Sequence, residues 1–251
     1  MRFSDKVVIV TGAGQGIGRG YANAFAKEGA RVVIAEVNES KAKAVAKEIA
    51  DSGPQAMAIA TDVSDADSVD RMVKTTMDKW GRIDVLINNA AIFNAIQVGP
   101  IERLTPEEWN RVIAVNLSGM FLCCKAVTPI MKSQKRGKII NISSGVTMIG
   151  RTGYPHYVAS KAGVIGLTRA LARELGSWNI NVNSVAPGPV TTEVSHTTIS
   201  RQEIDALVAQ QCIKRESTPK ELVGPVMFLA SDEADFISGA LLNVDGGLNM
   251  Y

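Results

Sequence analysis

Short aliphatic and β-branched runs alternate along the chain with longer segments whose apolar residues recur at helical spacing. Val69, Met72 and Val73, for example, would share one face of a helix. Near-continuous apolar strands separated by such helices are typical of a parallel sheet covered on both faces. The pattern therefore predicts an α/β fold with a doubly wound, Rossmann-like sheet, whose strands are expected at 6–10, 31–35, 55–60, 83–88, 138–143 and 180–186.

Signals for helix ends support this alternation. Gly29 and Gly81 each follow a helical segment, at the position where a glycine commonly ends a helix. Thr105 precedes a proline and two glutamates, the order expected at a helix start. The one long stretch without a clear pattern lies at 187–200. We expect a substrate-binding lid there, within about 187–215.

Composition and charge narrow the class of partner. The 251 residues, 46% of them hydrophobic, fit a single domain spanning 1–251. A net charge of +2 creates no strong field for nucleic acid or an anionic membrane, so we expect a small-molecule partner. Two of the three cysteines, Cys123 and Cys124, are adjacent, which is a poor arrangement for a disulfide. With no apolar leader pattern at the start, a cytoplasmic protein is expected.

A glycine-rich motif, TGAGQGIG at 11–18, lies directly after the first predicted strand and before a helical segment. Glycines there allow a tight turn and bring the backbone close to a pyrophosphate, whose charge the helix N-terminus stabilises. A ligand-free glycine turn is the alternative, but the strand–motif–helix context favours a dinucleotide. The expected cofactor-binding residues of the motif are Gly12, Gln15, Gly16, Ile17 and Gly18.

The nature of the dinucleotide is indicated by Glu36, at the end of the second predicted strand. It follows the glycines by about 20 residues, where a carboxylate accepts hydrogen bonds from the adenosine ribose and disfavours a 2′-phosphate. Neither Gln15 nor Val37 supplies a cation for such a phosphate. A solvated carboxylate is the alternative, but the spacing favours NAD over NADP.

Catalytic chemistry is suggested by Tyr157 and Lys161, one helical turn apart on one face. A nearby cation favours phenolate and would lower the pKa of the tyrosine toward neutrality, where proton exchange with an alcohol is efficient. Such pairs also occur by chance on exposed helices. Ser144, after the fifth predicted strand, would add a hydroxyl at the edge of the sheet where ligands bind, although it could simply cap a turn.

Taken together, the motifs resemble the short-chain dehydrogenase/reductase family over essentially the whole chain. The resemblance rests on TGAGQGIG at 11–18, NNAA at 88–91, Asn116, NISS at 141–144, YVASK at 157–161 and PGPVTT at 187–192. It implies a sheet of about seven parallel strands with helices on both faces, and a homotetramer. The chain departs from the family's common NNAG motif at Ala91, so an added methyl must fit beside the cofactor.

The resemblance also implies individual roles. Tyr157 would be the general acid/base, Ser144 would bind the substrate oxygen and stabilise its developing charge, and Lys161 would bind the nicotinamide ribose and lower the tyrosine pKa. Asn116 would hold a water that relays protons from the lysine. The remaining cofactor contacts would be Asp62 and Val63 at the adenine, Asn89 and Ala90 at the adenosine side, and Pro187, Gly188, Val190 and Thr192 along the nicotinamide segment.

No metal is implied, because the two histidines, His156 and His196, are far apart and no cysteine–histidine ligand spacing appears. We expect His156 to be a surface or lid contact rather than a second base. Apolar residues in the loops near the catalytic motifs predict a medium-sized hydrophobic or aromatic ketone or secondary alcohol as substrate. With Ser144 and Tyr157, the expected substrate contacts are Phe93, Val146 and Tyr154.

Other functions remain open at this point. A 3-oxoacyl-thioester (acyl-carrier-protein) reductase preferring NADPH is disfavoured by Glu36 and slightly favoured by Arg151. A sugar or dihydrodiol dehydrogenase would need more polar loops, although Asn94 and Gln97 are present. A non-catalytic dinucleotide-sensing protein would usually lack the tyrosine or the lysine.

Overall fold

The computed structural model describes residues 1–94, 96–195 and 197–250, and these contain one seven-stranded sheet in the order β3-β2-β1-β4-β5-β6-β7. Every neighbouring pair of strands is parallel, which confirms the predicted doubly wound sheet. The last strand comes from the C-terminal segment, for which no bounds were predicted. The strands are β1 (Val7–Thr11), β2 (Arg31–Glu36), β3 (Ala56–Ala60), β4 (Val85–Asn88), β5 (Gly137–Ile142), β6 (Ile180–Pro187) and β7 (Leu241–Val244).

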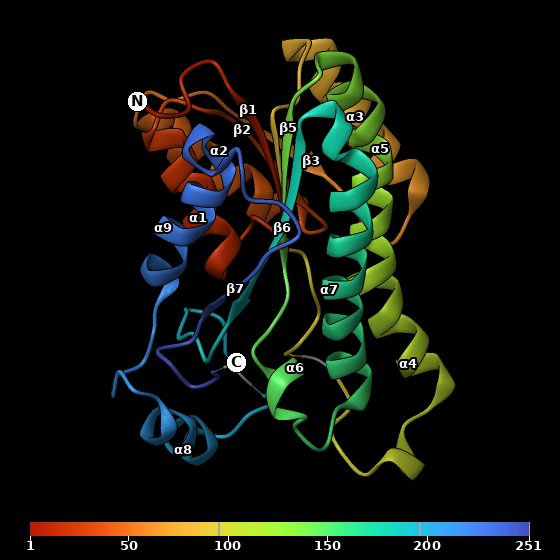
Figure 1. Ribbon diagram of the computed structural model, residues 1–251, viewed down its shortest axis with the longest axis vertical. Coiled ribbons are helices and arrows are strands. Elements are labelled where there is room, and N and C mark those ends of the chain that lie inside the picture. The colour runs from red at the N-terminus through yellow and green to blue at the C-terminus, as the bar shows by residue number, and fades with distance from the viewer. Residues whose placement is uncertain (95, 196, 251) are drawn as a thin grey trace.

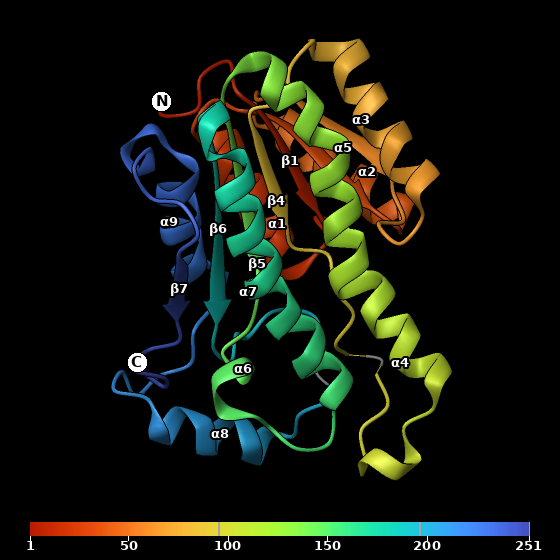
Figure 2. The same cartoon turned by 45° about the vertical axis from the view of Figure 1, so that its right-hand side comes forward.

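Helices cover both faces of the sheet (Figure 1). One face carries α1 (Gly16–Lys27), α2 (Glu39–Asp51) and α9 (Pro219–Ala230), and the other carries α3 (Ala66–Trp80), α5 (Gly119–Gln134) and α7 (Pro155–Leu175). Figure 2 shows that α6 (Val146–Ile149) and α8 (Arg201–Gln210) lie beyond the carboxyl ends of the strands. The predicted lid segment, about 187–215, therefore contains a helix, α8, which begins just after the patternless stretch 187–200.

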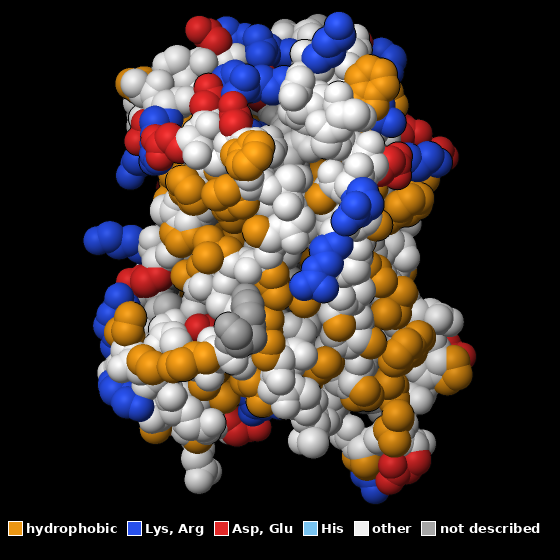
Figure 3. Space-filling view, in the orientation of Figure 1, with side chains coloured by type: hydrophobic (Ala, Val, Ile, Leu, Met, Phe, Trp, Pro, Cys, Tyr) orange, Lys and Arg blue, Asp and Glu red, His pale blue; other side chains and the backbone are white. Residues whose placement is uncertain are grey.

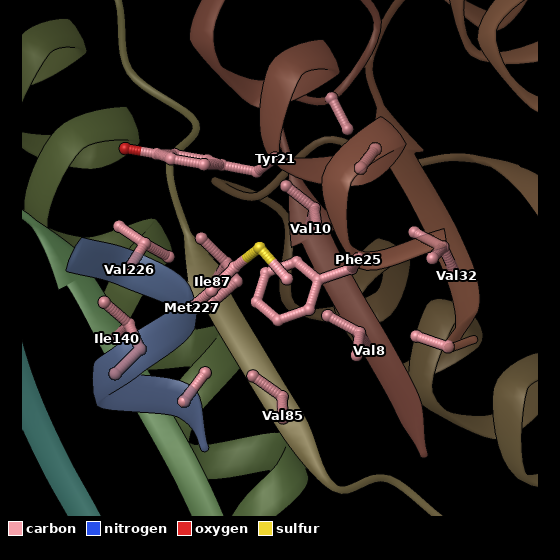
Figure 4. Packing of buried hydrophobic residues seen from close by; sticks show 14 of the residues in the cluster. Val8, Val10, Tyr21, Phe25, Val32, Val85, Ile87, Ile140, Val226 and Met227 are labelled. Atoms are coloured by element: carbon pink, nitrogen blue, oxygen red, sulfur yellow. The ribbon is translucent and has the colours of Figure 1, made fainter. Parts of the chain in front are cut away.

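Two hydrophobic clusters, one on each face, hold these layers together. Val8 and Val10 of β1 point into the cluster that contains α1, α2 and α9, whereas Ile9 points into the cluster with α3 and α5. Figure 4 shows the first cluster, with Phe25 between β1 and α9. Since both faces of each central strand are buried, the strands need continuous apolar runs, as the sequence has.

The predicted helix ends are found. Thr105 caps α4 (Pro106–Ile113) by accepting a hydrogen bond from the Glu108 N–H, and Gly81 ends α3 with a φ of 68°. A π-helical turn, Ala114–Ser118, joins α4 to α5. By length and composition alone the continuous helix Pro106–Gln134 could cross a membrane, but Cys123, Val127 and Met131 belong to the core against the sheet.

We expect Ile140→Ala to lower the free energy of unfolding by about 2–5 kcal/mol, because the side chain is fully buried in the cluster of Figure 4 and its removal leaves a cavity. Ile101→Ala is the matched control. Its side chain is 72% exposed, so the change should stay within about 0.5 kcal/mol. Urea unfolding followed by circular dichroism measures both, and similar losses in the two variants would contradict the assignment of the core.

Candidate active site

The site forms where the winding of the chain reverses, between β1 and β4. These strands are neighbours although β2 and β3 lie between them in sequence, and ligands of such sheets bind outside the carboxyl ends at this point. The Thr11 hydroxyl accepts hydrogen bonds from the backbone N–H groups of Asn89 and Ala90, both at 3.0 Å. The Asn89 amide donates to the carbonyls of Thr11 and Gly12. The glycine loop and the end of β4 are thereby joined.

The glycine loop leaves room for a ligand at the start of α1. Gly12 has a φ of 62°, and a Cβ there would lie 2.8 Å from Ala90 Cα. A Cβ on Gly18 would lie 2.1 Å from the Gly12 carbonyl oxygen, so neither position accepts a larger residue. The Gln15 side chain does not cap this helix. The N–H groups of the first turn can therefore bind an anion. The loop fits the pyrophosphate of a dinucleotide.

One carboxylate already contacts this helix start. Glu193 Oε1, in the lid segment, accepts a hydrogen bond of 2.9 Å from the Gly16 N–H. Arg19 Nη1 lies 3.8 Å from the same carboxylate oxygen. The hydrogen bond from Gly16 lowers the pKa of Glu193 below its usual value. Sequence reasoning missed Glu193, because no local signal links two residues so far apart in the chain.

The adenosine side of the loop is formed by Glu36 at the end of β2. Its two carboxylate oxygens accept hydrogen bonds from the N–H groups of Gly14, at 3.1 Å, and Asn38, at 3.2 Å. The carboxylate thus lies against the glycine loop, as expected. Asp62 and Val63 follow β3. The Asp62 carboxylate accepts from the Ser64 N–H and hydroxyl, and Val63 packs against Gly119 of α5.

The three predicted catalytic side chains come together at the carboxyl end of β5. Ser143, just after this strand, donates a hydrogen bond of 2.8 Å to the Lys161 carbonyl, which fixes α7 against β5. Tyr157 forms a hydrogen bond with Ser144. The Lys161 ammonium donates to the Ile142 carbonyl at 2.8 Å and lies 5.9 Å from the centre of the Tyr157 ring.

Burial determines the electrostatic state of this group in the protein alone. Burial raises the pKa of Tyr157 well above its usual value, and the hydrogen bond with Ser144 lowers it only in part. Lys161 was expected to lower that pKa, but it is itself buried, and burial lowers its own pKa to about 8. In the protein alone, desolvation disfavours the charged form of both groups. The expected lowering of the tyrosine pKa, to which the positive nicotinamide would contribute, stays a prediction.

Asn116 lies in the π-helical turn and is fully buried. Its side chain accepts from the Ile92 N–H at 2.8 Å and donates to the Ile92 carbonyl and the Ser160 hydroxyl. It therefore ties the loop after β4 to α7, one residue from the lysine. The expected water relay stays a prediction.

A cavity of about 430 Å³ connects the catalytic group to the glycine loop. Its walls include residues of the lid that the sequence did not single out, Ile199, Ile204 and Leu207. Thirteen predicted site residues line it: Gln15, Ile17, Asn89, Phe93, Ser144, Val146, Tyr154, Tyr157, Lys161, Pro187, Gly188, Val190 and Thr192. Predicted site residues that do not line it are Gly12, Gly16, Gly18, Glu36, Asp62, Val63, Ala90 and Asn116.

The aromatic residues pack around the catalytic tyrosine. The ring centres of Phe93 and Tyr154 lie 4.7 Å and 6.0 Å from that of Tyr157. Arg151 contacts the face of Tyr154 and forms an ion pair with Glu203 of α8, so the lid is held to the loop before α7.

The expectation for His156 was wrong. Its side chain is 0% exposed, with its Nε2 3.7 Å from a Glu108 carboxylate oxygen, and burial lowers its pKa. The residue follows Pro155 in the first turn of α7, where the helix packs against α4. His196, the other histidine, lies outside the described residues.

Comparisons with known proteins agree with this geometry. The sequence profile of a family described as enoyl-(acyl carrier protein) reductase matches residues 12–249. The chain is 43% identical to a 3-oxoacyl-(acyl-carrier-protein) reductase of Synechocystis sp., over 98% of both chains, and 38% identical to one of Thermotoga maritima, over 99% of both. A crystal structure of levodione reductase superposes with a TM-score of 0.93 at 32% identity, covering 98% of each chain.

The lowered pKa of Lys161 predicts a specific pH dependence of stability. Below pH 8 the folded protein must protonate a buried amine, whereas above the unfolded pKa of 10.5 the amine is neutral in both states. Between these pH values the stability of the wild type should therefore rise relative to Lys161→Met, by about 3 kcal/mol. Denaturant unfolding at a series of pH values measures the difference. Lys43→Met, which removes a 67% exposed lysine and keeps Lys161, should instead give a curve parallel to that of the wild type. A wild-type curve parallel to that of Lys161→Met would refute the shift.

Proposed function

This chain belongs to the short-chain dehydrogenase/reductase family, and we propose that it transfers a hydride reversibly between a nicotinamide cofactor and a ketone or secondary alcohol. The observation that carries the proposal is the single cavity joining Ser144, Tyr157 and Lys161 to the glycine loop. Such a cavity can hold the nicotinamide end of a dinucleotide and a substrate carbonyl side by side.

The bound nicotinamide would supply the hydride in reduction and accept it in oxidation. Ser144 donates a hydrogen bond to the substrate oxygen and stabilises the negative charge that develops there. Tyr157 gives its phenolic proton to that oxygen, so that one hydride and one proton convert the ketone to an alcohol. The Lys161 cation then stabilises the resulting phenolate, which opposes the cost of burying it.

The first candidate substrate is the 3-oxo group of an acyl thioester. The two reductases named above carry this name, and their identities of 43% and 38% extend over 98% and 99% of the chain. They favour this alternative over the medium-sized hydrophobic or aromatic ketone or secondary alcohol expected from the loops. The apolar walls of the cavity, including Ile199, Ile204 and Leu207, would accept an acyl chain.

A hydrophobic or aromatic ketone is the second candidate. Its support is the aromatic packing of Phe93 and Tyr154 around Tyr157, together with the close likeness to levodione reductase. A sugar or dihydrodiol receives less support: Asn94 lines the cavity, but Gln97 is bonded instead to the Arg103 carbonyl. The presence of serine, tyrosine, lysine and asparagine together argues against a non-catalytic sensor.

We propose NAD as the preferred cofactor, because the Glu36 carboxylate lies at the glycine loop where it can accept hydrogen bonds from the adenosine ribose. The family relatives do not decide between NAD and NADP. We also propose a cytoplasmic location, which is consistent with the free thiols of Cys123, Cys124 and Cys212.

A homotetramer is the proposed assembly, with no nucleic-acid or membrane partner. Hydrophobic side chains gather on the side of the molecule that carries α4, α5 and α7 (Figure 3). Trp109 of α4, Phe121 of α5 and Trp178 just after α7 are 39%, 47% and 42% exposed. Exposed aromatic residues of this kind are enriched in protein interfaces.

We expect Tyr157→Phe to lower kcat by on the order of 10²–10⁴-fold, because the variant cannot donate the proton, while binding of the reduced nicotinamide cofactor persists. Tyr154→Phe is the matched control. The hydroxyl of Tyr154 is buried without a hydrogen-bond partner among the described residues, so its loss should change kcat far less. Steady-state assays of nicotinamide absorbance measure both. Full activity in Tyr157→Phe would contradict the proposed acid.

A substrate panel tests the two candidate classes. We expect kcat/KM for a short 3-oxoacyl thioester to exceed that for cyclic and aromatic ketones by at least about tenfold, since differential transition-state binding sets this ratio. The panel is run with NADH and with NADPH, and includes a sugar ketone as a polar control. A preference for the aromatic ketones would instead select the second candidate.

A further inference from the structure

We propose that Lys41 is a specificity-determining residue, whose ammonium can pair with a 2′-phosphate on the adenosine ribose and which Glu36 opposes. The inference rests on the proposed nicotinamide dinucleotide site. The sequence did not indicate this cation, because Lys41 lies neither in the glycine motif nor directly after Glu36.

The position of Lys41 follows from the start of α2. The Asn38 side chain caps this helix by accepting from the Lys41 N–H at 3.0 Å, which fixes the lysine in the first turn. Its ammonium then reaches back to the glycine loop and donates to Gln15 Oε1 at 2.5 Å. Gln15, the loop position that supplies no cation for a 2′-phosphate, thus has the Lys41 ammonium of α2 beside it.

Lys41 and Glu36 pack against the same glycine. A Cβ on Gly14 would lie 2.6 Å from Glu36 Cγ and 2.9 Å from Lys41 Cβ. The carboxylate that disfavours a 2′-phosphate and the cation that would bind one therefore lie side by side at the edge of the loop. A phosphate there would be repelled by Glu36 and attracted by Lys41.

The neighbouring cations are already engaged by carboxylates. Arg19 pairs with Glu48 at 2.8 Å, and Lys43 pairs with Glu39 at 2.6 Å. Within residues 1–94, 96–195 and 197–250, Lys41 forms no ion pair within 4 Å, although it attracts the Glu193 carboxylate at longer range. Its ammonium donates to the neutral Gln15 amide. An incoming phosphate would therefore exchange a neutral acceptor for a charged one, which makes the stronger hydrogen bond.

The test measures cofactor affinity without any substrate. Dissociation constants for NADH and NADPH are obtained by fluorescence titration of the full chain, in the wild type, Glu36→Gln, Lys41→Met and the double variant. We expect Glu36→Gln to weaken NADH binding and strengthen NADPH binding, each by about tenfold, because a charged hydrogen bond to ribose is lost and a repulsion is removed. Adding Lys41→Met should then weaken NADPH binding about tenfold more than NADH binding.

Lys43→Met in the Glu36→Gln background is the matched control, since it removes the same charge two residues further along α2. It should leave the ratio of the two affinities within about twofold, because an exposed charge at greater distance is screened. Each variant is checked by circular dichroism, and Lys41→Gln replaces Lys41→Met if the latter is misfolded.

Two results would overturn the inference while leaving the proposed function intact. Equal effects of Lys41→Met and Lys43→Met would mean that only net charge matters. Equal weakening of NADH and NADPH by Lys41→Met would mean that the lysine merely supports the loop through Gln15. Failure of the wild type to bind either reduced cofactor would refute the proposed function, and the inference with it.

Discussion

The hydrogen bonds between Thr11 and Asn89 join the two strand ends between which the winding of the chain reverses. Everything in the candidate site is arranged around this junction. It places the glycine loop beside the end of β4, and β5 and β6 follow in the sheet. Ser144 after β5 and the nicotinamide segment after β6 therefore open into the same cavity as the loop. One reversal in strand order thus gathers residues from the whole length of the chain.

Burial of the catalytic group opposes the ionisation that its chemistry needs. Tyr157 and Lys161 are 9% and 2% exposed, and burial raises the pKa of the phenol and lowers that of the amine. In the protein alone, burial thereby shifts both ionisation equilibria toward the neutral forms. Perturbed pKa values of this kind are common in active sites, where groups are arranged for the reacting state rather than for stability. The proposed cofactor and substrate would complete the charge balance.

Anion recognition in the site is distributed over several chain segments. The start of α1 offers N–H groups, of which Gly16 is bonded to Glu193 from the lid. Glu36 occupies two further N–H groups at the adenosine side. Cofactor binding must therefore compete with or accommodate carboxylates of the protein itself. This arrangement couples the lid to the cofactor site, since Glu193 lies between Thr192 and Val194, which line the cavity.

The sequence by itself determined the features that depend on local spacing. The strands, the caps at Thr105 and Gly81, the glycine loop and the one-turn spacing of the catalytic tyrosine and lysine follow from short-range periodicity and backbone preferences. The family resemblance added the order of the motifs and the expectation of about seven strands in the predicted sheet.

Only the tertiary structure decided how buried each group is and what it meets from distant segments. His156 was expected near the surface but is enclosed where α7 packs on α4, and in the protein alone burial raises the pKa of Tyr157. The contacts of Glu193 with Gly16 and of Lys41 with Gln15 likewise join segments with no common sequence signal. Desolvation and long-range pairing depend on which elements pack together, and no local pattern encodes that.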